Sequence, residues 1–82
     1  MQRNEIAHII RELVAEKAEI EPDFDADAQF RKDLGMDSLL ALEFITAIEK
    51  RLQIRIPEGD YPQMTSLNGT LGVIEQTLAA KA

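Results

Sequence analysis

The chain has 82 residues, no cysteine, and fifteen acidic against nine basic side chains, for a net charge of −6. A domain of this length buries one modest core, so we expect a binding or carrier function rather than an enzyme that encloses its substrate. The lack of cysteine excludes disulfides and thiolate metal sites, while the negative charge disfavours nucleic acids and favours partners with basic surfaces.

The first predicted element is an amphipathic helix over residues 4–17. Its apolar residues recur at the three- and four-residue spacing that gives a helix one buried stripe. They are Ile6, Ile9, Ile10, Leu13 and Val14. The charged residues between them, Arg11 included, are expected on the solvated face. His8 is the only histidine in the sequence and has no metal-ligating partner beside it, so we interpret it as a solvated side chain.

Residues 18–37 show no sustained period and contain Pro22, which breaks a helix. A structureless loop of this length is unusual in a small domain unless apolar side chains hold it against the core. The residues expected to act as such anchors are Ile20, Phe24, Phe30 and Leu34. The sequence therefore predicts a long but ordered first loop.

The loop contains aspartates at alternate positions, Asp23, Asp25 and Asp27. A calcium-binding EF-hand loop begins with this spacing but needs glycine at its sixth position and glutamate at its twelfth. Ala28 and Leu34 occupy those positions instead. We therefore predict a solvated acidic loop without a dedicated metal site, and weak binding of divalent cations is the alternative.

The second predicted helix spans residues 38–52 and follows Asp37, a good N-capping residue. Placing its residues at 100° intervals separates two sets of side chains. The core face holds Ala41, Phe44, Ile45, Ile48 and Leu52, and the solvent face holds Leu39, Leu42, Glu43, Thr46 and Lys50. Two leucines on a solvated face indicate a surface for docking partners. The alternative is a rotated helix with both leucines in the core.

After the second helix the sequence predicts a short extended connection and then a short helix. Ile54 and Ile56 alternate with polar residues and are expected to point inward, and Pro57 ends the segment. Residues 58–64 contain glycine and proline and support at most one or two turns of helix.

The last predicted helix covers residues 66–80, with Thr65 as its cap. Its apolar stripe is Leu67, Leu71, Ile74 and Leu78, and its glycines, Gly69 and Gly72, weaken it. Three main helices, one short helix and a long first loop together predict an all-α fold, a small antiparallel bundle. We expect residues 1–82 to form a single domain.

Ser38 stands at the first position of the second helix and is the best candidate for chemistry. A hydrolase nucleophile would sit in a Gly-x-Ser-x-Gly turn with a histidine base, whereas Leu39 and Leu40 follow here. Ser38 is therefore better interpreted as a group that another enzyme modifies than as a catalytic residue. A helix N-terminus also favours an attached phosphate by roughly 0.3–1 kcal/mol.

The run Asp33-Leu34-Gly35-Met36-Asp37-Ser38-Leu39, continued by Ala41-Leu42-Glu43 and Ile56-Pro57, resembles the acyl carrier protein family. The resemblance covers essentially the whole chain. It implies that Ser38 is esterified with 4′-phosphopantetheine, transferred from coenzyme A by a phosphopantetheinyl transferase that supplies magnesium. Acyl groups would then travel as thioesters on the thiol of this arm, and the protein itself would catalyse nothing.

The resemblance also implies partners. Asp37, Leu39, Leu42 and Glu43 occupy positions that meet the transferase and the enzymes that load, elongate or transfer the acyl group, and Thr46 lies on the same face. We expect a monomer that binds no nucleic acid. No apolar run approaches the ~20 residues of a membrane span, and polar residues 2–5 replace a secretory apolar stretch, so we expect a cytoplasmic protein.

The type of carrier stays open at this point. Fatty-acid carriers usually have an acid directly after Asp-Ser-Leu, where this chain has Leu40, and Leu-x-Ala-Leu-Glu after the serine is closer to polyketide carriers. Met36-Asp37 departs from the Gly-Gly that often precedes the serine in peptidyl carriers. A peptidyl or aminoacyl carrier is the alternative, and so is an unmodified helical adaptor that binds through Leu39 and Leu42.

Overall fold

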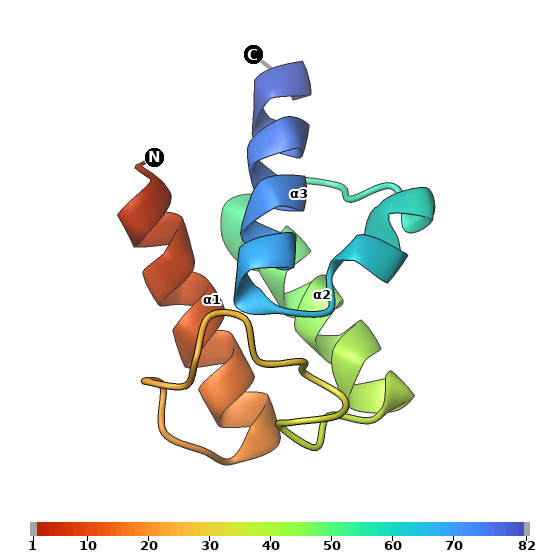
Figure 1. Cartoon of the computed structure of the whole chain (residues 1–82). Helices are drawn as coiled ribbons and strands as arrows, with labels where there is room; N and C mark the ends of the chain where they lie inside the picture. The colour runs from red at the N-terminus through yellow and green to blue at the C-terminus, as the bar shows by residue number, and fades with distance from the viewer. Residues whose placement is uncertain (1, 82) are drawn as a thin grey trace.

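The computed structural model describes residues 2–81, except the side chain of Lys81. Within this range the chain forms α1 (Arg3–Ala18), α2 (Ser38–Leu52), the 3₁₀-helix η1 (Glu58–Gln63) and α3 (Leu67–Lys81). α1 packs against both α2 and α3 and runs in the opposite direction to them (Figure 1). The predicted all-α bundle, with its short extra helix and long first loop, is confirmed.

The core is built from the apolar stripes that the sequence predicts. Each of the three α-helices contributes, and the short segment after α2 adds two isoleucines that point inward as expected. The buried members of these predicted sets are Ile6, Ile9, Ile10, Val14, Phe44, Ile45, Ile48, Ile54, Ile56, Leu67, Leu71 and Ile74. Leu13, Leu52 and Leu78 are half-buried at its edge. The apolar stripe of each α-helix therefore faces the core as expected.

The cap of α3 differs from the expectation. Ser66, not Thr65, caps the helix, because the Ser66 hydroxyl oxygen accepts the backbone N–H of Gly69 at 3.1 Å. The helix itself begins one residue later than predicted, at Leu67. Thr65 contributes a backbone carbonyl that accepts the N–H of Phe30 at 2.8 Å. Thr65, which the sequence suggested as the cap, therefore binds the first loop through its backbone instead.

The structure explains why glycine stands at position 69, although glycine weakens a helix. A Cβ atom at this position would lie 2.2 Å from the backbone oxygen of Gln63. Only glycine lets the end of η1 approach α3 this closely without displacing backbone. The packing of η1 on α3 therefore offsets the weakening that glycine causes in a helix.

The first loop, over residues 19–37, is tied to α1 by an arginine. The Arg11 Nη1 donates to the backbone oxygens of Pro22 at 2.9 Å and Phe24 at 2.5 Å. Its guanidinium carbon also lies 5.0 Å from the centre of the Phe24 ring, in cation–π geometry. Arg11, expected on the solvated face, is half-buried instead, because its guanidinium satisfies carbonyls that have no secondary-structure partner.

The other side of the loop is fixed to the start of α3. Asn68 donates from its backbone N–H to the Ala26 oxygen at 3.1 Å and from its side chain to Asp27 at 2.7 Å. Phe30 is buried and its ring stands edge-on to the ring of Phe44, with 5.3 Å between centres. Three of the predicted anchors, Phe24, Phe30 and Leu34, thus pack against or within the core, and Ile20 is half-buried.

Two of the three alternating aspartates, Asp25 and Asp27, accept hydrogen bonds within the chain. Asp25 accepts the backbone N–H of Asp27 at 2.8 Å, as in an Asx turn. Residues 2–81 contain no group of three or more His, Cys, Asp or Glu side chains placed to hold a metal ion. In the same part of the chain, no helix has the length and apolar character needed to cross a bilayer.

Thr70 makes a test of core packing possible. Its side chain is fully buried in α3, and its hydroxyl has no hydrogen-bond partner among the described residues. Because an unpaired buried hydroxyl is destabilising, Thr70→Val should raise the free energy of unfolding by about 1 kcal/mol in urea denaturation. Thr77→Val is the matched control, since the Thr77 hydroxyl donates to the Val73 oxygen at 2.9 Å. Equal losses of stability in both variants would contradict the prediction.

Candidate functional site

The turn that leads into α2 alternates between inward and outward residues. Gly35 has a φ of +74°, which glycine adopts without strain. Met36 then points into the core, with 1% of its surface exposed, and its backbone N–H donates to the Phe30 oxygen at 2.9 Å. Asp37 and Ser38 follow on the outside of the molecule. The buried methionine therefore fixes the side on which Ser38 emerges.

Asp37 caps α2 as the sequence predicts. Its Oδ1 accepts the backbone N–H of Leu40 at 2.9 Å. This contact satisfies one of the free N–H groups of the first turn and places a negative charge at the positive end of the helix. The start of α2 is thereby fixed at Ser38.

Ser38 is exposed at the first position of α2, and none of the residues 2–81 makes a hydrogen bond to its hydroxyl. The only histidine of the chain, His8, is exposed on α1 and lies against the Glu12 carboxylate. Within the described residues, therefore, no imidazole contacts Ser38 to activate it as a nucleophile. The geometry presents the hydroxyl to an external enzyme.

The leucines beside Ser38 lie in solvent. Leu39 is 64% exposed and Leu42 is 53% exposed, whereas the opposite face of α2 buries Phe44, Ile45 and Ile48. The alternative of a rotated helix, with both leucines in the core, is therefore wrong. Residues four apart on a helix are neighbours, so Ser38 and Leu42 share one strip of surface.

The other predicted members of this face are also exposed but make contacts within the chain. Glu43 lies 3.6 Å from the Lys17 ammonium on α1. The Thr46 hydroxyl donates to the Leu42 backbone oxygen at 3.0 Å, on its own helix. Leu42, Glu43 and Thr46 line one shallow hollow together with Lys50. Leu42, Glu43 and Thr46 therefore lie on one side of α2.

An apolar hollow of about 590 Å³ opens beside Asp37, between α2 and η1. Its apolar lining includes Phe30, Met36, Ala41, Phe44, Ile45, Tyr61 and Met64. Arg31 and Lys32 line the same hollow and are exposed. No pattern in the sequence indicates this hollow, because it forms between segments that are distant along the chain.

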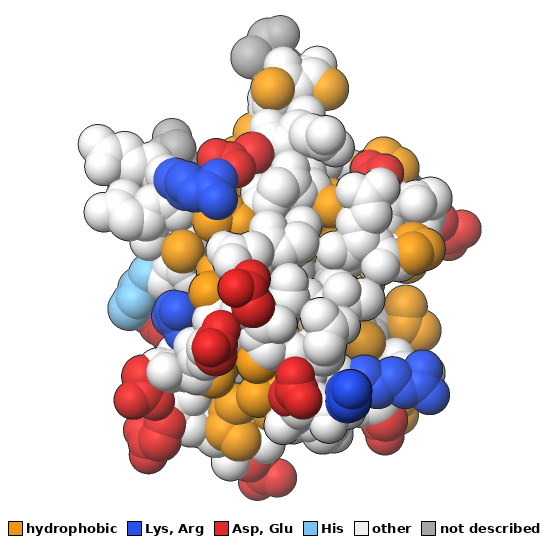
Figure 2. All heavy atoms as spheres, in the orientation of Figure 1, with side chains coloured by type: hydrophobic (Ala, Val, Ile, Leu, Met, Phe, Trp, Pro, Cys, Tyr) orange, Lys and Arg blue, Asp and Glu red, His pale blue; other side chains and the backbone are white. Residues whose placement is uncertain are grey.

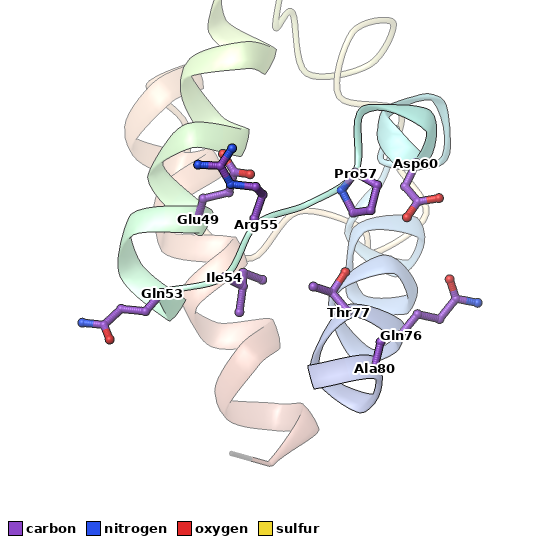
Figure 3. A pocket seen from close by; sticks show the side chains of 9 residues that line it. All are labelled: Glu49, Gln53, Ile54, Arg55, Pro57, Asp60, Gln76, Thr77 and Ala80. Atoms are coloured by element: carbon purple, nitrogen blue, oxygen red, sulfur yellow. The ribbon is translucent and has the colours of Figure 1, made fainter. Parts of the chain in front are cut away.

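A second hollow, of about 780 Å³, lies at the opposite end of α2 from Ser38 (Figure 3). Ile54 points into it, Gln76 and Thr77 of α3 form its far wall, and Gln53 turns away. Because this hollow is at the C-terminal end of α2, it is separate from the serine by the length of the helix.

The sequence analysis placed Met36 in the motif before Ser38 but did not predict its burial, and it did not single out Tyr61. Met36 is a single apolar residue with Gly35 before it and Asp37 after it. It belongs to no periodic run, so no pattern marks it as buried. Tyr61 is half-buried in a short 3₁₀-helix and packs against the core. Both contribute to the hollow beside Asp37.

The family comparison agrees with this geometry. The sequence profile of the family described as "Phosphopantetheine attachment site" matches residues 8–74. The chain belongs to the acyl carrier protein family. It is 37% identical over 70 residues to polyketide-8 synthase acyl carrier protein 2 of Streptomyces avermitilis, covering 84% of this chain and 80% of that protein. The expected family resemblance is confirmed.

Further relatives match over nearly the full length of the chain. The acyl carrier protein of Guillardia theta is 32% identical over 81 residues, which cover 98% of this chain and all of that protein. The acyl carrier protein of Akkermansia muciniphila is 31% identical over 77 residues, covering 93% and 96%. The cofactor of this family is covalent 4′-phosphopantetheine, and its members are carriers, so this acyl carrier protein is not an enzyme.

The cap of α2 gives a direct test. Asp37→Ala should lower the free energy of unfolding by about 1 kcal/mol, because the Leu40 N–H loses its acceptor at the end of the helix. Urea denaturation measures the change. Asp37→Asn is the matched control, since asparagine caps helices about as well as aspartate. Identical stability of the alanine variant and the wild-type protein would contradict the capping role.

Proposed function

We propose that Ser38 is the attachment point of the 4′-phosphopantetheine arm. The observation that carries this proposal is an exposed hydroxyl, held at the first position of a capped helix, to which no residue from 2 to 81 makes a hydrogen bond. Ser66, the only other serine of the chain, is buried and caps α3. The family profile includes Ser38 in its matched range.

The loading reaction follows from the chemistry of the two partners. The Ser38 Oγ forms a bond to the phosphorus that carries the pantetheine group of coenzyme A. The pyrophosphate bond of coenzyme A breaks, the adenosine bisphosphate leaves, and the transferase accepts the hydroxyl proton. The resulting phosphodiester lies at the positive end of α2, where its negative charge is favourable.

The exposed face of α2 is the proposed docking surface. Asp37 and Leu39 flank the serine, and Leu42, Glu43 and Thr46 extend the surface along the helix. Two exposed leucines give partner enzymes apolar area to bury next to the attachment point. The transferase and the enzymes that load, elongate or transfer acyl groups would share this surface.

The cargo is an acyl thioester, as in fatty-acid or polyketide synthesis, carried by residues 1–82 as one monomeric domain in the cytoplasm. Leu40 in place of the acid common in fatty-acid carriers, and the similarity to a polyketide synthase carrier, support the polyketide type. The apolar hollow beside Asp37 offers a cargo chain a surface away from water. Mass spectrometry of the group attached to the native protein distinguishes these cargoes from an aminoacyl or peptidyl group.

Loading of the purified apo protein tests the attachment site. Incubation with coenzyme A and a broad-specificity phosphopantetheinyl transferase should add one phosphopantetheine group per chain by intact-mass spectrometry. Ser38→Ala should abolish the addition without changing the circular dichroism spectrum. Thr65→Ala, which removes another exposed hydroxyl, should load as the wild-type protein does. A folded wild-type chain that gains no mass would overturn the proposal.

An unmodified helical adaptor is the second candidate, favoured by the exposure of Leu39 and Leu42. It predicts partner binding on a chain that is never loaded.

If the chain is a carrier, Leu42→Asp should lower kcat/KM for loading about tenfold, because a carboxylate replaces an apolar contact.

Gln76→Asp adds the same charge on an exposed position of α3 and is the matched control for this variant. Its loading rate should match that of the wild-type protein. A Leu42→Asp variant that loads at the wild-type rate would show that the leucine face does not meet the transferase.

A further inference from the structure

The first loop ends in a closed turn over residues 29–34, just before the segment that presents Ser38. We call it the Asp33 turn, because Asp33 closes it twice. The Asp33 Oδ2 accepts the backbone N–H of Gln29 at 2.8 Å, and the Asp33 N–H donates to the Gln29 oxygen at 2.8 Å. The Leu34 N–H donates to the same oxygen at 3.2 Å. In a capping box, too, an acid reaches back to a free N–H at the start of a helix.

Phe30 lies within the Asp33 turn and holds two other parts of the fold through its backbone. Its N–H donates to the Thr65 oxygen at 2.8 Å, directly before α3, and its oxygen accepts the Met36 N–H at 2.9 Å. Its side chain is buried, with 3% of its surface exposed. Because both backbone groups of Phe30 are used, the conformation of the turn decides where Met36 is held, two residues before Ser38.

Acidic side chains are common in this part of the molecule, so charge alone does not distinguish Asp33. Figure 2 shows several of them spread over the first loop. Asp25 is also exposed and also accepts a backbone N–H, that of Asp27 at 2.8 Å. The contact of Asp25 lies earlier in the loop, whereas Asp33 closes the turn next to the attachment segment. The two aspartates therefore make the same kind of contact at different separations from Ser38.

We propose that Asp33 is a positioning residue for the loading of Ser38. The inference rests on the proposed function, since loading is the reaction that it concerns. No residue from 2 to 81 makes a hydrogen bond to the Ser38 hydroxyl, so Asp33 acts through the backbone of its turn. Without the carboxylate the Gln29 N–H loses its acceptor, the turn opens, and Met36 is held less firmly. The Ser38 oxygen is then aligned less often with the phosphorus of coenzyme A.

Two variants at one position separate alignment from docking in the loading kinetics. Asp33→Ala should lower kcat about tenfold and leave the KM for the apo protein within about twofold, because alignment acts on the chemical step. Asp33→Asn loses the charge but keeps an oxygen that accepts the Gln29 N–H, so its kcat should stay within about threefold of the wild type. A wild-type kcat in Asp33→Ala would overturn the inference. So would an equal rise of KM in both variants, which would show that the transferase binds the charge.

Asp25→Ala is the matched control. It removes the same charge and the same kind of backbone contact from the same loop. Circular dichroism should show helical folds for both alanine variants, and Asp25→Ala should load with the kcat and KM of the wild-type protein. An equal fall of kcat in the two variants would indicate a general effect of loop order and would overturn the specific role of Asp33.

Hydrogen exchange of the apo protein tests the same role without loading. The Met36 N–H should exchange about tenfold faster in Asp33→Ala than in the wild type or in Asp25→Ala, because the turn that carries its acceptor opens locally. Unchanged protection of Met36 would overturn the inference, even if loading is slow. A wild-type chain that never loads would overturn the proposed function. A wild-type chain that loads, beside an Asp33→Ala variant with the same kcat, would overturn only the role of Asp33.

Discussion

The burial of Met36 is the constraint on which the site depends. Its side chain is in the core and its backbone N–H is bound to Phe30, so the chain cannot rotate between Gly35 and the first turn of α2. Asp37 then fixes the helix start from outside by binding the Leu40 N–H. With one residue held inside and the next acting as a cap, Ser38 can emerge only on the solvent side.

The first loop is ordered because its polar groups bind parts of the fold that are distant along the chain. Arg11 satisfies two loop carbonyls from α1, and Asn68 binds the opposite side of the loop from α3. Phe30 fills the space between them. A loop of this length would otherwise be unfavourable in so small a core. Its order matters for function, because it ends in the turn that presents Ser38.

Several acidic side chains near α2 have roles within the fold. The excess of acids suggests a basic partner, but several carboxylates near α2 stabilise helix starts, backbone turns or the α1 to α2 contact. A charge that is used inside the fold is less available to a partner than its count suggests.

The sequence by itself determined the helices, their buried faces, the cap at Asp37, and the exposed leucines beside Ser38. These features depend on spacing within one element, and a helical period of 3.6 residues makes them readable. Only the tertiary structure decided that Met36 is buried, that Arg11 holds the loop, that Ser66 rather than Thr65 caps α3, and that Glu43 pairs with Lys17. Such contacts join residues from different elements, and the requirement to satisfy backbone groups and fill the core selects them after the helices have packed.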